Sequence, residues 1–441
     1  MQIRQYSEFL KFYFARYFAR RWCKFWLATM VFVPVNSMFG QHQAIQDPIC
    51  PHRPVLMIHG MLGSGDNYQY LANYLLTWGY CAQHLHVYNW NTLGRNPNEV
   101  KRLDSVINAI LQTEQAAQLD IVGHSAGGSL AYNYLSDSAR STRVARYVHI
   151  GSRPMPKPAG PSGAIPTLNI YSHGDLAVPG ADIAGATNVA FSTYDHFGIV
   201  AADSTANEVF HFFYGSLPPP ARAWSKSNTA TQVQVLQMGD NTPESGATIT
   251  WYQAPKTIED ATKIQQTVTN DLGKASLGSL LPQQPYMVVC KPREGRAVAY
   301  YFPEVTNGAL PLYLRTLPNT GMVRMLLQGI PQRTGEAAFV LFGSSGAFLP
   351  GGPPLVLNGD TLNTKAITPA AKTVVALFLY DNGDGQTSRQ TQGAFAAAPF
   401  MNAIDYYLPT SQRPFVLQWK GKAYEIPAIP SSKAVTVVVL P

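Results

Sequence analysis

Residues 119–132 place a short apolar run, a glycine-rich turn and a helical pattern in direct succession. The run 119–122 is typical of a buried strand, and residues 129–132 are typical of the helix that follows. Between them lies the sequence G-H-S-A-G-G, in which Gly123 and Gly127 flank Ser125. Such a turn is so tight that a side chain at either glycine would collide with the neighbouring strand and helix. A chain with this segment is therefore expected to build a parallel sheet covered by helices.

The same alternation of short apolar runs and helical stretches extends over residues 54–215. After Pro97, apolar side chains at Val100, Leu103 and Ile107 recur at helical spacing, so we expect a helix there. Apolar runs separated by helices indicate parallel strands joined by crossovers. The expected strands are residues 55–59, 82–88, 119–123, 144–150, 167–171 and 189–192. We therefore predict an α/β fold with a six-stranded, mostly parallel sheet.

A proline run from Leu217 to Pro220 interrupts this pattern and is typical of a stiff spacer between domains. Beyond it, apolar residues alternate with a period of two, as in strands that bury one face. These segments are residues 232–238, 247–253, 297–302, 338–342, 374–380 and 435–440. We predict an α/β domain over residues 41–216, a proline-rich linker over 217–228 and a β-rich domain over 229–441, built from one or two β-sandwiches.

The first 40 residues differ from the rest of the chain in charge. Their six basic side chains and one acid account for five of the seven net positive charges of the protein. The remaining charge is small and gives no indication of nucleic acid binding. A basic stretch followed by the apolar run 25–35 has the order of a secretory signal peptide over residues 1–40, which predicts a secreted or periplasmic protein. A membrane anchor is the alternative, although a run of eleven residues is short for a bilayer span.

Three cysteines follow that segment, namely Cys50, Cys81 and Cys290. An exported protein can keep a disulfide. Cys50 precedes the first expected strand and Cys81 opens the second, so these two residues can pair if their Cα atoms approach to about 6 Å. Cys290 ends the apolar run 286–290 and is expected to be a buried free thiol.

Ser125 stands where a turn of this kind presents a nucleophile. A serine hydroxyl needs a base that accepts its proton, and the base needs an acid that holds its tautomer. In hydrolases of this architecture the chain order is serine, acid, histidine. Asp175 follows the fifth expected strand, and His196 follows the sixth in a loop at the carboxyl edge of the sheet. We predict a catalytic triad of Ser125, Asp175 and His196.

Two residues remain open as alternatives in this triad. Asp195 is a reserve acid, although a residue adjacent to His196 usually points away from its ring. His211 is the other histidine that follows Asp175, but the apolar run 209–213 indicates a helical and packed position.

The tetrahedral intermediate of acyl transfer needs amide donors, each contributing about 3 kcal/mol. The amide of Ala126, next to the nucleophile, is one expected donor. The loop after the first strand offers the amide of Met61 beside a glycine. Leu62 in that loop, and Trp90 and Leu93 in the loop after the second strand, are expected to contact substrate.

This chemistry needs no metal and no cofactor. One segment, Asp381 to Gly385, has the composition of a calcium-binding loop. However, Gly383 stands where an oxygen ligand is required, so we expect a glycine-rich hairpin turn instead.

Residues 54–63, 123–128 and 172–179 together resemble the true-lipase branch of bacterial and archaeal α/β-hydrolases. Residues 185–200 are similar to the histidine region of the small lidless bacterial lipases. The layout, in which a β-rich half follows the hydrolase module, is similar to that of archaeal two-domain lipases, whose β-domain is held to assist lipid engagement. The resemblance covers residues 52–215 and implies the same triad and oxyanion donors as the chemistry does.

The resulting hypothesis is a lipase that cleaves long-chain acyl esters through an acyl-enzyme, with a lipid or membrane surface as a partner. A secreted esterase for short-chain or polymeric esters is the nearest alternative. A non-catalytic adhesion protein on a hydrolase fold is the alternative from another class, and the intact triad disfavours it. Since the β-rich half holds none of the expected catalytic groups, we expect it to engage substrate rather than take part in the chemistry.

Overall fold

The first half of the chain is built around a sheet whose six strands all run parallel. Their order is β2-β1-β3-β4-β5-β6, so the direction of winding reverses between β1 and β3. The strands are β1 (Val55–Ile58), β2 (Leu85–Tyr88), β3 (Leu119–His124), β4 (Val144–Ile150), β5 (Thr167–Ser172) and β6 (Thr187–Phe191). The predicted six-stranded parallel sheet is therefore confirmed. Such a reversal leaves a crevice at the carboxyl ends of the two central strands, here β1 and β3.

The computed structural model describes residues 50–94, 96–219, 231–253, 261–278, 284–305, 310–411 and 414–441. The predicted signal segment 1–40 and most of the predicted linker 217–228 lie outside these residues. Helix α6 ends at Tyr214 and strand β7 begins at Thr231, on either side of that linker. The domain boundaries themselves stay predictions.

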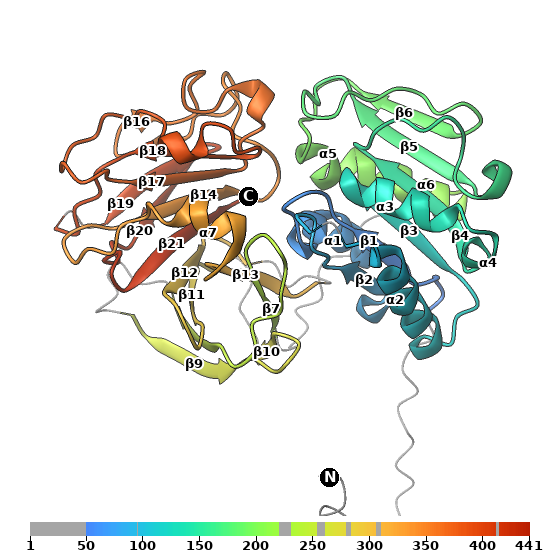
Figure 1. Ribbon diagram of the computed structural model, residues 1–441, viewed down its shortest axis with the longest axis horizontal. Helices are drawn as coiled ribbons and strands as arrows, with labels where there is room; N and C mark the ends of the chain where they lie inside the picture. Colours follow the sequence, from blue (N-terminus) through green and yellow to red (C-terminus); the bar gives the residue numbers. More distant parts are fainter. Residues whose placement is uncertain are drawn as a thin grey trace, which may run out of the picture. The chain divides into compact units, whose positions relative to one another are not determined.

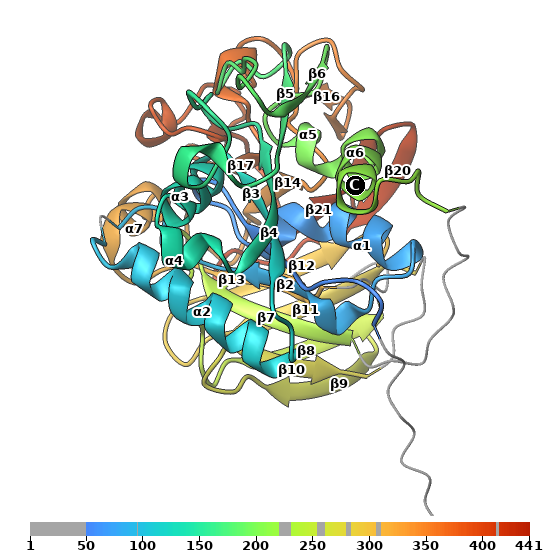
Figure 2. The same cartoon turned by 90° about the vertical axis from the view of Figure 1, so that its right-hand side faces the viewer.

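Helices cover both faces of the parallel sheet (Figure 1), and Figure 2 shows α2, α3 and α4 on one side of it with α1 and α6 on the other. The helices are α1 (Gln69–Thr77), α2 (Glu99–Thr113), α3 (Ala126–Leu135), α4 (Ser138–Ser141), α5 (Gly198–Ala201) and α6 (Asp203–Tyr214). Val55 and Met57 of β1 pack with α1 and α6, whereas Leu56 and Ile58 pack with α2 and α3. This alternation follows because successive side chains of a strand point to opposite faces.

The second strand begins later than predicted, at Leu85 instead of residue 82. Residues Ala82–His84 form a 3-10 turn, closed by a hydrogen bond from the amide of His84 to the carbonyl of Cys81. Cys81 at the start of this turn forms a disulfide with Cys50, with the two Cα atoms 5.8 Å apart. The disulfide thereby connects the segments that precede β1 and β2.

The described residues from 231 to 441, which we call the β-rich region, form three sheets. Their orders are β10-β7-β13, β18-β17-β14-β21-β12-β11-β8-β9 and β16-β15-β19-β20. The elements are β7 (Thr231–Gln237), β8 (Thr248–Gln253), β9 (Lys263–Val268), β10 (Lys274–Leu277), β11 (Tyr286–Lys291), β12 (Ala297–Phe302), β13 (Leu312–Thr316), α7 (Gly321–Leu327), β14 (Phe339–Gly343), β15 (Val356–Leu357), β16 (Asp360–Thr361), β17 (Ala376–Tyr380), β18 (Met401–Asp405), β19 (Phe415–Trp419), β20 (Lys422–Ile426) and β21 (Ala434–Leu440).

The eight-stranded sheet packs on both of its faces. Val435 and Val437 of β21 lie in a core shared with the three-stranded sheet, whereas Val438 and Leu440 lie in a core shared with the four-stranded sheet. Two sandwich-like layers therefore share one central sheet. Cys290 of β11 is a buried free thiol, as predicted.

Among the helices of the described segments, none combines the length and the apolar character that crossing a bilayer requires.

Candidate active site

Ser125 joins β3 to α3 in an unusual backbone conformation, with φ 55° and ψ −121°. A left-handed φ is uncommon for a residue with a side chain and persists only where the surroundings hold it. The amide of Ser125 donates to the carbonyl of Ile150 at 3.0 Å, and the hydroxyl of Ser152 donates to the carbonyl of Ser125 at 3.0 Å. The main chain of Ser125 is thus held on both sides by the loop at the end of β4.

The glycines around Ser125 are required by close backbone contacts. A Cβ atom on Gly127 would lie 2.0 Å from the carbonyl oxygen of Ile58, and one on Gly123 would lie 2.7 Å from the Cα atom of Gly128. Neither neighbour is a flexible side chain that could move aside. The steric reason expected for both glycines is therefore present in the structure.

His196 and Asp175 form a buried pair at the same edge of the sheet. Nδ1 of His196 lies 2.7 Å from Oδ2 of Asp175. The other carboxylate oxygen of Asp175 accepts hydrogen bonds from the amides of Ala177 and Val178, each at 2.9 Å. With Nδ1–H donated to the carboxylate, Nε2 of His196 carries the lone pair that a general base needs.

The two alternative residues have other roles. Oδ1 of Asp195 accepts from the amides of Phe197 and Gly198 at 2.9 and 3.1 Å, so this carboxylate caps the turn after His196 instead of contacting its ring. His211 lies in α6, as expected, but its side chain is exposed and not packed. The helix turns this position toward solvent because its apolar face is formed by Val209, Phe210 and Phe213.

His124, the residue before Ser125 in the chain, contacts His196. Nε2 of His124 lies 2.9 Å from the backbone oxygen of His196, and the two ring centroids are 4.7 Å apart. Burial holds the pKa of His124 well below its usual value, so the ring is neutral and donates from Nε2. Within the described part of the chain, Oγ of Ser125 makes no hydrogen bond to His196. Catalytic hydrogen bonds are often long without substrate and shorten when it binds.

A pocket opens at Ser125 and contains four of the eight predicted site residues. Its lining includes Met61, Trp90, Ser125, Ala126 and Leu176. A Cβ atom on Gly60 would lie 2.8 Å from Cβ of Ser125, so the loop that carries Met61 passes directly against Ser125. Leu176 is 57 % exposed at the rim, which gives the pocket an apolar edge.

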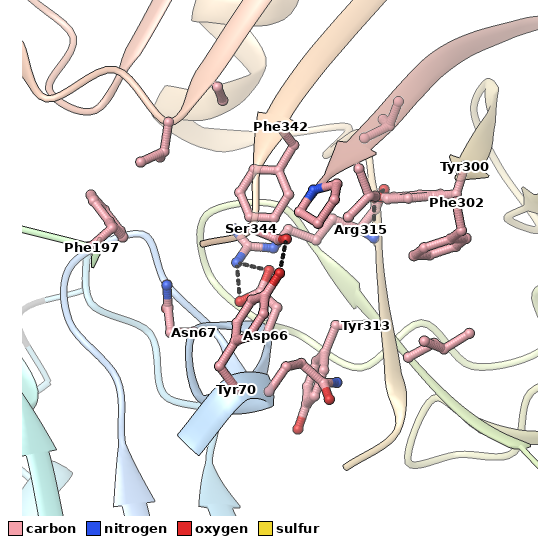
Figure 3. A pocket seen from close by; sticks show the side chains of 18 of the residues that line it. Asp66, Asn67, Tyr70, Phe197, Tyr300, Phe302, Tyr313, Arg315, Phe342 and Ser344 are labelled. Carbon is pink, nitrogen blue, oxygen red and sulfur yellow. Dashed lines mark hydrogen bonds and ion pairs between the residues drawn. The ribbon is translucent and has the colours of Figure 1, made fainter. Parts of the chain in front are cut away.

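A second, largely apolar cavity of about 690 Å³ adjoins the first (Figure 3). Leu62, Phe197, Tyr300, Phe302 and Phe342 are among the residues that line it. Met61 and Phe400 line both cavities, so they lie where the pocket at Ser125 meets the apolar cavity. The third predicted substrate contact, Leu93, lines neither cavity and packs instead against the core of the β-rich region.

Phe400 belongs to the site but was not predicted from the sequence. Its ring stacks on His196 with centroids 5.6 Å apart and an interplanar angle of 10°, and it contacts Phe197 edge to face. The residue has a left-handed φ of 63°, which is rare for an aromatic residue. No pattern in the β-rich half indicated a contact with the histidine loop.

The segment Asp381 to Gly385 is not the hairpin turn that the sequence suggested, because the strands it connects, β17 and β18, pair in parallel. Carboxylate oxygens of Asp381, Asp384 and Asp405 lie within 4.8 Å of one another, an arrangement that can bind a cation. Oδ2 of Asp381 already accepts from Nη1 of Arg333 and from the amide of Gly383, both at 2.9 Å.

The parallel sheet, the strained serine between strand and helix, and the acid–histidine pair at its carboxyl edge define an α/β-hydrolase fold. Residues 53–180 match the family model described as the alpha/beta hydrolase fold, and residues 345–439 match the model of a C-terminal domain.

The similar solved structures named here each cover 37 % of this chain. An α/β hydrolase from a sediment metagenome of the lagoon of Mar Chica, Morocco, has 14 % identity over 37 % of this chain and 91 % of its own, with a TM-score of 0.30. A structure from a study of carboxylesterases of the thaumarchaeon Nitrososphaera gargenis has 12 % identity over 37 % of this chain and 90 % of its own, with a TM-score of 0.28. A bromoperoxidase from Bacillus anthracis has 15 % identity over 37 % of this chain and 92 % of its own, with a TM-score of 0.29.

Proposed function

We propose that this protein hydrolyses carboxylic esters through an acyl-enzyme on Ser125. The observation that carries the proposal is the 2.7 Å contact between Nδ1 of His196 and Oδ2 of Asp175, at the sheet edge where the strained Ser125 lies. A buried carboxylate beside Nδ1 orients the ring and stabilises the imidazolium that forms during the reaction. A strained serine at the same sheet edge as such a pair is the arrangement that nucleophilic acyl transfer requires.

The reaction follows from these roles. Oγ of Ser125 attacks the ester carbonyl carbon while Nε2 of His196 takes its proton, and the amides of Met61 and Ala126 donate to the oxyanion. The tetrahedral intermediate then collapses, and the alcohol leaves with the proton from His196. Water, activated by the same base, attacks the acyl-enzyme and releases the carboxylic acid and free Ser125.

We further propose long-chain acyl esters as the substrate, which makes the enzyme a lipase. The adjoining apolar cavity of about 690 Å³, which shares Met61 and Phe400 with the pocket at Ser125, supports this choice because the transfer of an acyl chain from water to an apolar space is favourable. A short-chain or polymer esterase is the second candidate, favoured by the exposed Leu176 at the open rim. The Cys50–Cys81 disulfide supports secretion or a periplasmic location, since cytosolic thiols are kept reduced.

The test is a series of p-nitrophenyl esters from acetate to palmitate, together with an emulsified triglyceride. We expect the wild-type protein to turn over esters and Ser125→Ala to lose activity by a factor of about 1000 or more, with an unchanged circular dichroism spectrum. Ser136→Ala, after the end of the same helix α3, is the control and should stay active. Wild-type turnover by a folded Ser125→Ala variant would refute the mechanism, and preference for acetate would favour the esterase.

A further inference from the structure

The turn that carries Met61 has an unfavourable backbone conformation. The amide of Gly63 donates to the carbonyl of Gly60 at 3.1 Å and closes a four-residue turn. Leu62 within that turn has a left-handed φ of 61°, a region that residues with a side chain rarely adopt. Contacts from outside the turn are therefore needed to keep this conformation populated.

Arg315, in β13 of the β-rich region, supplies one set of these contacts. Its Nη1 donates to the carbonyl of Leu62 at 2.8 Å, and its Nη2 donates to Oγ of Ser64 at 3.0 Å. Nη2 also lies 2.9 and 2.8 Å from the two carboxylate oxygens of Asp66, a pairing drawn in Figure 3. One planar guanidinium thus binds three residues of the segment that follows β1, namely Leu62, Ser64 and Asp66.

Asn241, between β7 and β8, supplies a second set. Its Nδ2 donates to the carbonyl of Gly63 at 2.8 Å and to the carbonyl of Trp90 at 3.0 Å, and it lies 3.2 Å from Nε2 of His59. Nδ1 of His59 in turn lies 2.8 Å from the carbonyl of Gly60. Burial lowers the pKa of His59 to about 4, which leaves this histidine neutral with Nε2 as an acceptor.

We propose that Asn241 and Arg315 are positioning residues of the oxyanion hole. By binding the carbonyls of Gly63 and Leu62, they hold the strained turn that presents the amide of Met61 beside Ser125. The proposal rests on the ester hydrolysis proposed above and deepens it. It also assigns the β-rich region a part in the chemistry, in addition to the substrate engagement expected from the sequence.

The first test replaces Asn241 with Asp in the full-length protein. Asn241 has a left-handed φ of 59°, which Asp tolerates. Asp also keeps the size of the side chain, but it removes both N–H donors. Asn363→Asp is the matched control, because Asn241 and Asn363 are each 5 % exposed and both lie in the β-rich region. Nδ2 of Asn363 likewise donates to two carbonyls, those of Leu349 and Pro353, each at 3.0 Å.

The readouts are chosen to separate positioning from stability. For Asn241→Asp we expect kcat on p-nitrophenyl butyrate to fall about tenfold or more with KM near the wild-type value, because the turn acts on the transition state. Affinity for an alkylboronic acid, which forms a tetrahedral adduct on serine, should fall by a similar factor. Asn363→Asp should leave both quantities near their wild-type values.

Arg315→Lys is a second test that does not depend on the first variant folding. Lysine keeps the positive charge but lacks the planar fork, so the same loss of kcat and of boronic acid affinity is expected. Arg333→Lys is its control, since Arg333 bridges Glu336 and Asp381 elsewhere in the β-rich region.

Two results would overturn this inference while leaving the proposed ester hydrolysis intact. One is a wild-type kcat and boronic acid affinity in folded Asn241→Asp and Arg315→Lys, and the other is an equal loss in the control variants. Labelling of wild-type Ser125 by a fluorophosphonate distinguishes this case from failure of the proposed function. A wild-type protein that is neither labelled nor active on esters overturns the proposed function, and the inference with it.

Discussion

His196 is held on three sides by residues from distant parts of the chain. Asp175 binds Nδ1 of its ring, His124 donates to its backbone oxygen, and the ring of Phe400 stacks on its face. The side chain is nearly fully buried, so these contacts determine its orientation without competition from water. This arrangement leaves Nε2 as the one ring nitrogen free for proton transfer.

If His196 is the base, His196→Ala should lower kcat/KM nearly as much as Ser125→Ala does. The double variant should lose hardly more, because the two side chains act as one unit. The kcat/KM values of the three variants on p-nitrophenyl butyrate test this expectation. His211→Ala, at an exposed position of α6, is the control. A comparable loss in that control, with the fold preserved, would assign the base to His211 instead.

Among the elements, β3 contains a buried carboxyl group with an incomplete set of partners. Asp120, its second residue, is buried, and its Oδ1 has no hydrogen-bond partner in the described residues. Burial raises the pKa of this carboxyl to about 7, while Arg53 and Arg146 act in the opposite direction. Between about pH 4 and pH 7 the folded state therefore holds a proton that the unfolded state has released, so stability falls as the pH rises through this range.

Replacing Asp120 with Asn should remove that pH-dependent loss. We expect Asp120→Asn to raise the free energy of unfolding by up to about 4 kcal/mol at pH 8, with much less change at pH 4. Thermal unfolding of both proteins at the two pH values measures the difference. Asp203→Asn, at an exposed position of α6, should show no such gain. An equal effect of Asp120→Asn at both pH values would contradict the assignment.

For the whole molecule, the apolar cavity is lined jointly by the α/β region and by the β-rich region. Leu62 and Phe197 come from the first, and Tyr300, Phe342 and Val437 come from the second. An acyl chain in this cavity would contact both regions. Activity on long chains is therefore expected to depend on residues that touch none of the triad.

Val437→Phe tests this dependence by adding side-chain volume to the cavity wall formed by β21. We expect activity on p-nitrophenyl palmitate to fall by about tenfold while activity on the butyrate stays near the wild-type value, because only a long chain reaches β21. The ratio of the two kcat/KM values is the measurement, and the short ester serves as the internal control. An equal loss on both esters, or no loss on either, would exclude the cavity as the acyl site.

The sequence by itself determined the parallel sheet, the turn at Ser125 and the order of serine, acid and histidine. These features could be predicted because the physics behind them is local. Strand periodicity is set by neighbouring residues, and Gly123 is required by a backbone contact with Gly128, a few residues further along the chain. The position of each loop then follows from the strand that precedes it.

Only the tertiary structure decided which side chains surround that site. Asn241 binds Gly63 across 178 residues of chain, and Arg315 binds Leu62 across 253. Phe400 reaches His196 from a loop whose own pattern contains no sign of the contact. A side chain's partners at such distances depend on how sheets pack, and local periodicity does not encode that packing.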